Sequence, residues 1–145
     1  MIPKFRAWDK KSKQIKNVEA INLSSRQVVL SEKALLEMGG MWSVCDMPTL
    51  LDDVILMQST GLFDKNGVEV FEGDIVKTTR FFGRADEVGG FYEYDKELIG
   101  IVKVLEGAWV IDIGNDAVHL WTEVEENEVI GNIYENPEYL KKRGN

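Results

Sequence analysis

LMQSTGLFDKNGVEVFEGDIVK, residues 56–77, is the stretch that decides the predicted fold class. A β-favouring run leads into the tetrad DKNG, where Asn66 and Gly67 tolerate the positive φ of a tight turn. A second β-favouring run follows, in which Gly73 and Asp74 mark a bulge or corner. The stretch therefore predicts two strands joined by a reverse turn, and it contains few groups that an enzyme would use.

Strand patterns also dominate the rest of the chain. They predict an opening hairpin over residues 4–23 with a break in register near Asn17, a short strand over 26–30, a hairpin over 98–114 that turns at Glu106 and Gly107, and a last strand over 127–135. Residues 80–97 are rich in glycine and aromatic residues without clear periodicity, which predicts a long loop between strands.

Two short helices complete the predicted elements. Ser31 is a suitable N-cap for a brief helix that Gly39 and Gly40 end. Residues 138–143 predict a terminal helix whose cations lie near its C-terminal end.

Short strands with tight turns and no alternating helices predict a mainly β protein built on a small, closed or nearly closed SH3-like barrel. The predicted organisation is an N-terminal hairpin and connecting region over 1–51, then the barrel with a C-terminal helix over 52–145, packed as one compact unit. About half of a set of strand residues should form the core: Ile75, Val76, Val102, Val104, Val110, Ile111, Ile130 and Ile133.

Length and composition bound the function. At 145 residues, 44% hydrophobic and 29% charged, the chain fits one soluble globular domain. The sequence has no apolar run long enough to cross a membrane and no secretory signal at its start, so the cytoplasm is the expected location. A single cysteine, Cys45, and a single histidine, His119, exclude an internal disulfide and the common zinc sites, and no cofactor is expected.

Charge is divided unevenly along the chain. Residues 1–16 contain six cations and one carboxylate, a net charge of +5, so the remainder carries −13 within a total of −8. One interpretation is that these cations keep a terminal hairpin soluble and protect an exposed strand edge. The other is a docking site, either for the acidic run over residues 123–138 or for nucleic acid, although a chain of −8 repels that polyanion at long range.

Candidate catalytic groups are sparse. Asp64, Asn66 and Gly67 resemble the start of a calcium loop, but the spacing of an EF-hand fails and a turn explains them better. Cys45 has no local nucleophile signature and is expected to be a small buried thiol, while His119 is expected to be partly buried. The carboxylates of the FEGD segment read as turn and capping groups, so we expect no enzyme activity.

The candidate interaction surface has two parts. The first is the basic hairpin, with Lys4, Arg6, Trp8, Lys10, Lys11 and Lys13. The second is the aromatic group of Phe81, Phe82, Phe91, Tyr92 and Tyr94. Aromatic residues on a long loop either form a recognition surface or fold inward and are buried, and the sequence favours neither.

Three blocks of the sequence resemble the signature segments of the YopX family: KFRAWDKKSKQI at the start, LMQSTGLFDKNGVEVFEGDIVK in the middle and EVIGNIYENPEYL at the end. The resemblance implies an SH3-like barrel with an added N-terminal part, and a protein of the kind encoded by bacteriophages and prophages in a bacterial cytoplasm. It implies no activity. Residues 31–53 and 80–97 match none of the blocks, so specificity is expected to reside there.

Three classes of function follow. The first choice is a non-catalytic interaction module that binds a protein partner or its own copies, with a homo-oligomer expected. The second is a nucleic-acid-associated protein that uses the barrel and the basic hairpin. An acidic decoy of a host DNA-binding protein is a variant of the first class, and an enzyme comes last.

Overall fold

The computed structural model describes residues 3–31, 48–85, 89, 91–120 and 126–142. It divides into two compact units, Met1–Ser59 and Thr60–Asn145, which are described separately. Strand β5 (Val54–Phe63) runs through the division, because it begins in the first unit and ends in the second.

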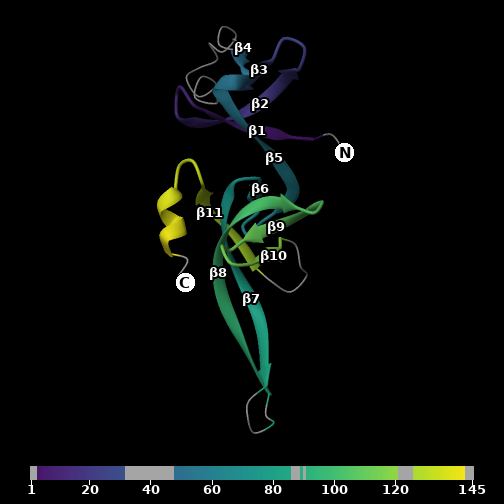
Figure 1. The fold of residues 1–145 in the computed structure, drawn as a ribbon, viewed down its shortest axis with the longest axis vertical. Helices are drawn as coiled ribbons and strands as arrows, with labels where there is room; N and C mark the ends of the chain where they lie inside the picture. The colour runs from purple at the N-terminus through teal and green to yellow at the C-terminus, as the bar shows by residue number, and fades with distance from the viewer. Residues whose placement is uncertain (1–2, 32–47, 86–88, 90, 121–125, 143–145) are drawn as a thin grey trace. The chain divides into compact units, whose positions relative to one another are not determined.

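The first unit is an antiparallel sheet (Figure 1). Its elements are β1 (Phe5–Asp9), β2 (Gln14–Asn22), β3 (Gln27–Ser31), β4 (Pro48–Leu50), a 3-10 turn η1 (Leu51–Asp53) and the start of β5, in the spatial order β4-β3-β2-β1-β5. The β1–β2 pairing confirms the predicted opening hairpin. The register of β2 against β3 shifts between Val18 and Ala20, close to the predicted break. Ala7, Val28, Leu30 and Val54 form its buried core.

The second unit contains β6 (Glu69–Phe71), β7 (Asp74–Ala85), β8 (Phe91–Leu105), β9 (Ala108–Asp112), β10 (Ala117–His119), β11 (Glu126–Asn132) and a 3-10 helix η2 (Pro137–Lys142). Five of these strands form an antiparallel sheet in the order β10-β9-β8-β7-β11. Its core cluster is Val70, Val76, Val102, Ile111 and Leu120. Five members of the predicted core set are buried, namely Ile75, Val76, Val102, Val110 and Ile111, whereas Val104 is exposed.

The prediction of a mainly β fold is confirmed, but of the predicted closed or nearly closed barrel, the closed form is not found among the described strands. The described strands form two antiparallel sheets, and the five-stranded sheet ends at β10 on one side and β11 on the other. An SH3-like strand arrangement stays a prediction. The helix predicted from Ser31 to Gly40 falls almost wholly outside the described residues, and the chain end forms the short 3-10 helix η2.

The predicted loop over residues 80–97 is also wrong, because strands β7 and β8 continue through it. Their register runs without a break from Ile75 opposite Ile101 to Ala85 opposite Phe91. Strand β11 accompanies β7 only as far as Thr79, and β9 accompanies β8 only from Ile101. Residues Arg80–Ala85 and Phe91–Lys96 therefore form a two-stranded extension, here called the ribbon (Figure 1).

Candidate interaction surface

The DKNG turn is held together by one buried carboxylate. Oδ1 of Asp64 accepts the backbone N–H groups of Asn66 and Val68, each at 2.8 Å. Its Oδ2 accepts the N–H of Val129 in β11 at 2.9 Å, although 65 positions separate the two residues. Asp64 is 7% exposed, so these bonds satisfy an otherwise costly buried charge. The carboxylate serves the turn, as the sequence predicted, and it also attaches the turn to β11, which the sequence did not predict.

Other residues of the signature blocks have similar structural roles. The buried carboxylate of Asp74 accepts the N–H of Phe71 at 2.8 Å, which fixes the corner between β6 and β7. Oδ1 of Asn132 accepts the N–H groups of Tyr134 and Glu135 at the end of β11. These polar side chains accept hydrogen bonds from the chain's own backbone at turns and corners. The residues on which the family resemblance rests therefore stabilise the fold.

The basic hairpin contains a well-organised ion pair. Nζ of Lys16 lies 3.2 Å from Oδ2 of Asp9, and both side chains are largely buried. Burial raises the pKa of Asp9, but hydrogen bonds from the Ser12 side chain, the Lys11 N–H and Lys16, together with the Lys16 charge, outweigh it. The pKa of this carboxyl therefore lies below its ordinary value.

Two further lysines of the hairpin contact the η1 turn of the same unit. Nζ of Lys11 lies 3.2 Å from Oδ2 of Asp53, and Nζ of Lys10 donates to the carbonyl oxygen of Asp52 at 3.1 Å. The carboxylate of Asp52 also accepts from Arg26 at 2.7 Å. Sequence reasoning missed these acidic partners because the LDD segment precedes a strand far along the chain. The only available signal was the adjacency of two carboxylates in a mostly apolar stretch.

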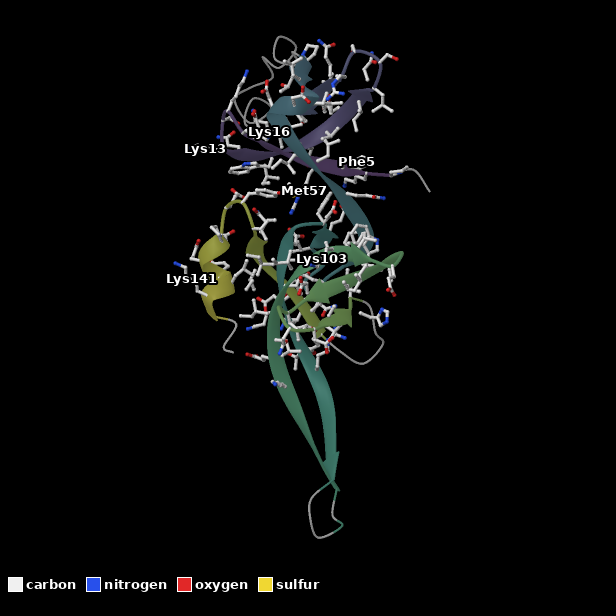
Figure 2. All side chains as sticks on the ribbon, in the orientation of Figure 1. Phe5, Lys13, Lys16, Met57, Lys103 and Lys141 are labelled. Carbon is white, nitrogen blue, oxygen red and sulfur yellow. The ribbon has the colours of Figure 1, made fainter. Side chains whose placement is uncertain are left out.

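The other members of the hairpin set occupy different positions. Lys4 and Lys13 are exposed, and Lys13 has φ of 56° at the β1–β2 turn (Figure 2). Arg6 and Trp8 are half-buried, and Trp8 lies opposite Ile15 on β2 and Ile55 on β5. The hairpin is therefore part of the packed sheet along most of its length.

Two described members of the acidic run, Glu126 and Glu128, have cations within their own unit. Glu126 and Glu128 lie 3.8 Å and 3.7 Å from Nζ of Lys65, and Glu128 lies 4.0 Å from Nζ of Lys77. These contacts supply local partners for two of the carboxylates proposed to dock the basic hairpin.

The five candidate aromatic residues all fall in the ribbon. The backbone register sets Phe82 opposite Tyr94, Tyr92 opposite Arg84, and Phe91 opposite Ala85. Phe81 lies opposite Asp95 in the same ladder. The structure thus brings together residues that the sequence placed on one irregular loop, and it arranges them along two paired strands.

A buried polar network lies where the ribbon leaves the sheet. Arg80 is 4% exposed, and its guanidinium donates to Oγ1 of Thr78 at 2.8 Å and to the carbonyl oxygen of His119 at 2.7 Å. The hydroxyl of Thr78 lies 2.6 Å from Oδ1 of Asn127, whose amide donates to the carbonyl oxygen of Leu120. This network joins β7 to β11 and to the end of β10, so the base of the ribbon is firmly anchored.

His119 and Cys45 are the chain's one histidine and one cysteine, and both bear on possible metal or acid–base chemistry. The His119 side chain is exposed, contrary to the prediction of a partly buried histidine, and Cys45 lies outside the described residues. Over the described ranges, groups of three or more His, Cys, Asp or Glu residues arranged to hold a metal are absent. None of the helices in those ranges has the length and hydropathy of a membrane-crossing segment.

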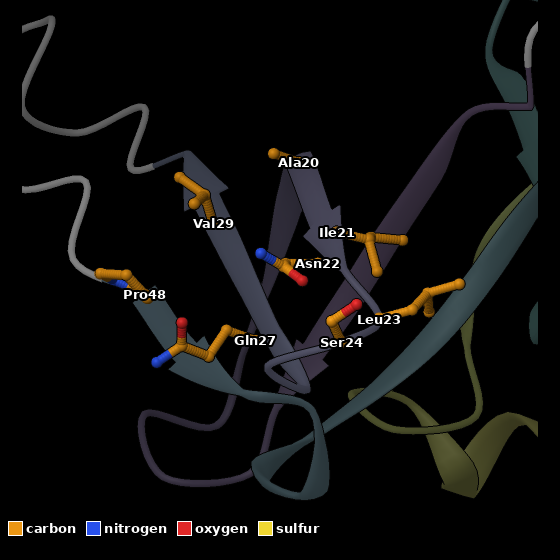
Figure 3. A pocket seen from close by; sticks show the side chains of 8 residues that line it. All are labelled: Ala20, Ile21, Asn22, Leu23, Ser24, Gln27, Val29 and Pro48. Carbon is orange, nitrogen blue, oxygen red and sulfur yellow. The ribbon is translucent and has the colours of Figure 1, made fainter.

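A hollow of about 620 Å³ lies on the first unit beside β4 (Figure 3). It is open to solvent and lined by Ala20, Ile21, Asn22, Leu23, Ser24, Gln27, Val29 and Pro48. Its lining combines aliphatic groups with two amides and a hydroxyl and includes no ionisable side chain, so it offers no acid–base chemistry.

Comparison with known proteins gives a family and several similar solved structures. The family model described as YopX protein matches residues 4–141. The crystal structure of protein EF1440 from Enterococcus faecalis is similar at a TM-score of 0.56 and 27% identity, over 97% of this chain and 99% of that one. The crystal structure of protein yopX from Bacillus subtilis is similar at a TM-score of 0.55 and 20% identity, over 94% and 95%, which shows a shared fold. No curated protein matches the chain.

Proposed function

Since this chain belongs to the YopX family, we propose that it acts as a non-catalytic interaction module whose contact surface is the ribbon. The observation that supports this proposal is that β7 and β8 continue as a pair beyond the strands next to them, β11 and β9. An isolated two-stranded ribbon is only marginally stable in water, and strands gain stability when a third strand or another surface covers them. The ribbon also carries five aromatic residues, the type most enriched in protein interfaces.

Charge and placement support a protein partner over nucleic acid. Of the six hairpin cations, Lys10, Lys11 and Lys16 each have a carboxylate or carbonyl oxygen within 3.2 Å. Binding to a phosphate backbone depends on cations that are available to neutralise phosphates, and the whole chain carries −8. The proposed setting is the one that the resemblance implies, an accessory protein of phage or prophage type in the bacterial cytoplasm.

The ribbon register defines a variant that tests this proposal. Arg80 lies opposite Lys96, so residues 81–95 can be replaced by the two-residue turn Asn-Gly, which closes a tight hairpin at that pair. The buried Arg80 network and the core cluster stay in place in this variant. The matched control reverses Lys10, Lys11 and Lys13 to Glu and leaves the ribbon intact.

Both variants and the parent protein are immobilised and exposed to bacterial lysate and to soluble copies of the parent, at low and at high salt. A parallel series of gel-shift experiments measures the binding of all three proteins to DNA and to RNA. We expect the shortened-ribbon protein to lose the contacts that the parent and the lysine-reversal variant share. Retention of every contact by a folded shortened-ribbon protein contradicts the proposal. Nucleic-acid binding that only the lysine reversal abolishes favours the alternative function.

A further inference from the structure

We propose that the outer edge of β7 in the ribbon pairs with the same edge of a second copy, around a two-fold axis at Gly83. This inference rests on the proposed function, because it names the partner of the ribbon. In the part of the chain that the structure describes, β11 pairs with β7 only over Asp74–Thr79, whereas β8 pairs with it as far as Ala85. The segment Arg80–Ala85 therefore has a described ladder on one side only, and such an edge is a template for another strand.

The geometry of a strand paired with its own copy limits the choice of register. Alternate residues of β7 direct their backbone N–H and C=O groups toward β8, so the outward groups occur at every second residue. In a symmetric antiparallel pair these outward groups must face each other. The two-fold axis must then pass through a residue, and residues equally distant from it lie opposite each other.

A centre at Gly83 gives the most favourable set of opposite residues. It sets Phe82 opposite Arg84 of the second copy, twice by symmetry, and it sets Phe81 opposite Ala85. An arginine beside an aromatic residue is a favourable cross-strand pair, since the cation is attracted to the ring. At the centre itself, glycine allows the two backbones to approach closely.

The neighbouring registers of β7 bring like charges together. A centre at Phe82 sets Arg80 opposite Arg84, and a centre at Arg84 sets that residue opposite itself. Like charges directly opposite each other destabilise a strand pair. Moving the centre to Phe81 would set Gly83 opposite Thr79, a residue that already pairs with Glu126 of β11.

The other edge of the ribbon is protected against such pairing. Glu93, Asp95 and Glu97 alternate along β8, so any symmetric register centred from residue 93 to residue 97 sets two carboxylates opposite each other. Charged residues of this kind are a common device that keeps an exposed strand from pairing. Because the β7 edge can pair and the β8 edge is protected, the ribbons form a closed dimer and not an extended stack of strands.

Cysteine cross-linking of the full chain tests the register. Cys45 is the only cysteine, so Cys45→Ser gives a background for single substitutions. In the proposed dimer the two residues 83 face each other with Cα atoms roughly 4.5–5.5 Å apart, within reach of a disulfide. We expect Gly83→Cys to form a disulfide-linked dimer under mild oxidation at low micromolar concentration. Phe82→Cys and Arg84→Cys should fail alone and cross-link when mixed, because they lie opposite each other.

Leu105→Cys, on an exposed residue at the β8–β9 turn, measures the rate of random collision. Cross-linking of Gly83→Cys no faster than Leu105→Cys overturns the two-fold register. Light scattering supplies a second readout, in which Arg84→Glu should weaken the dimer about tenfold by removing two arginine–aromatic pairs. A parent protein that stays monomeric overturns self-pairing. If the shortened ribbon still loses its lysate contacts in that case, the proposed function stands with a different partner.

Discussion

Removing the Asp64 carboxylate should destabilise the second unit more than removing any comparable exposed carboxylate. Asp64 accepts three backbone N–H groups at 2.8–2.9 Å, two from its own turn and one from β11. Hydrogen bonds to a charged acceptor contribute ~1.5–3 kcal/mol each. Asn66 and Val68 are exposed, so their N–H groups can bind water after the substitution, whereas Val129 is half-buried within β11. We therefore expect Asp64→Ala to cost about 2–4 kcal/mol, less than the sum of three bonds.

The isosteric change Asp64→Asn separates charge from shape. Its amide oxygen can keep the two turn contacts, but its NH₂ group then faces the N–H of Val129, and two donors meet. The cost should be about 1–3 kcal/mol, which is the usual penalty for leaving a buried donor unsatisfied. The control is Asp116→Ala, because Asp116 is exposed and accepts one local N–H, from Ala117 at 2.8 Å.

Urea unfolding, monitored by hydrogen exchange of peptides from β7 and β11, measures this cost in the second unit itself. With a denaturant dependence of ~1–3 kcal/mol per molar urea, Asp64→Ala should lower the midpoint by roughly 0.7–4 M, and Asp116→Ala should shift it far less. A change in the urea midpoint for Asp64→Ala no larger than that of the control would refute the view that this carboxylate holds the turn against β11.

Three further predictions concern packing and pH. The pKa of Asp9 is lowered in the folded chain, so the ionised carboxylate stabilises the first unit above the unfolded pKa of about 3.9, and this stabilisation is lost as the pH falls below it. Asp9→Asn should therefore flatten the decline in the urea midpoint of the first unit between pH 6 and pH 3. Gly100→Ala places a Cβ 2.5 Å from a backbone oxygen of β9, whereas Gly131→Ala places one 2.5 Å from the side-chain oxygen of Asn136, so the first should lower the melting temperature more. Adding Asn136→Ala should relieve only the second change, and only in part, because it removes the side-chain oxygen and Cγ of Asn136 and leaves its Cβ 2.9 Å away. Ile111→Ala, at a residue with no exposed surface in the core cluster, should cost about 2–4 kcal/mol in chemical denaturation, and a cost under ~1 kcal/mol would contradict the assigned core.

The sequence predicted those features that depend on neighbouring residues. The DKNG turn is present, with Gly67 at φ 81°, and the β8–β9 hairpin turns at Glu106 and Gly107, which both have positive φ. The strands on either side were recognisable because β-branched and aromatic residues dominate them. Such signals are local, so they survive without knowledge of the strand order.

Features that depend on distant pairing were not predictable in the same way. Whether the sheet closes is decided by which strands meet at its two edges, and the spacing of turns does not contain that information. The sequence favours a loop over residues 80–97 because they are rich in glycine and aromatic residues without clear periodicity, although Phe82 and Tyr94 lie opposite each other in an unbroken ladder. The salt bridge between Lys11 and Asp53 joins residues that only the β1–β5 pairing brings together.

Under the proposed function, the separate roles of the signature blocks and the ribbon would allow one scaffold to serve different partners. Asp64, Asp74 and Asn132 cap turns and corners, so changing them costs stability whatever the protein binds. The ribbon lies beyond the sheet and beyond the core cluster, and the Arg80 network anchors it at its base. Residues past that anchor can therefore change with little effect on the core. A change of edge charges or of the central glycine would alter which strand the ribbon accepts, and it would leave the sheet beneath it intact.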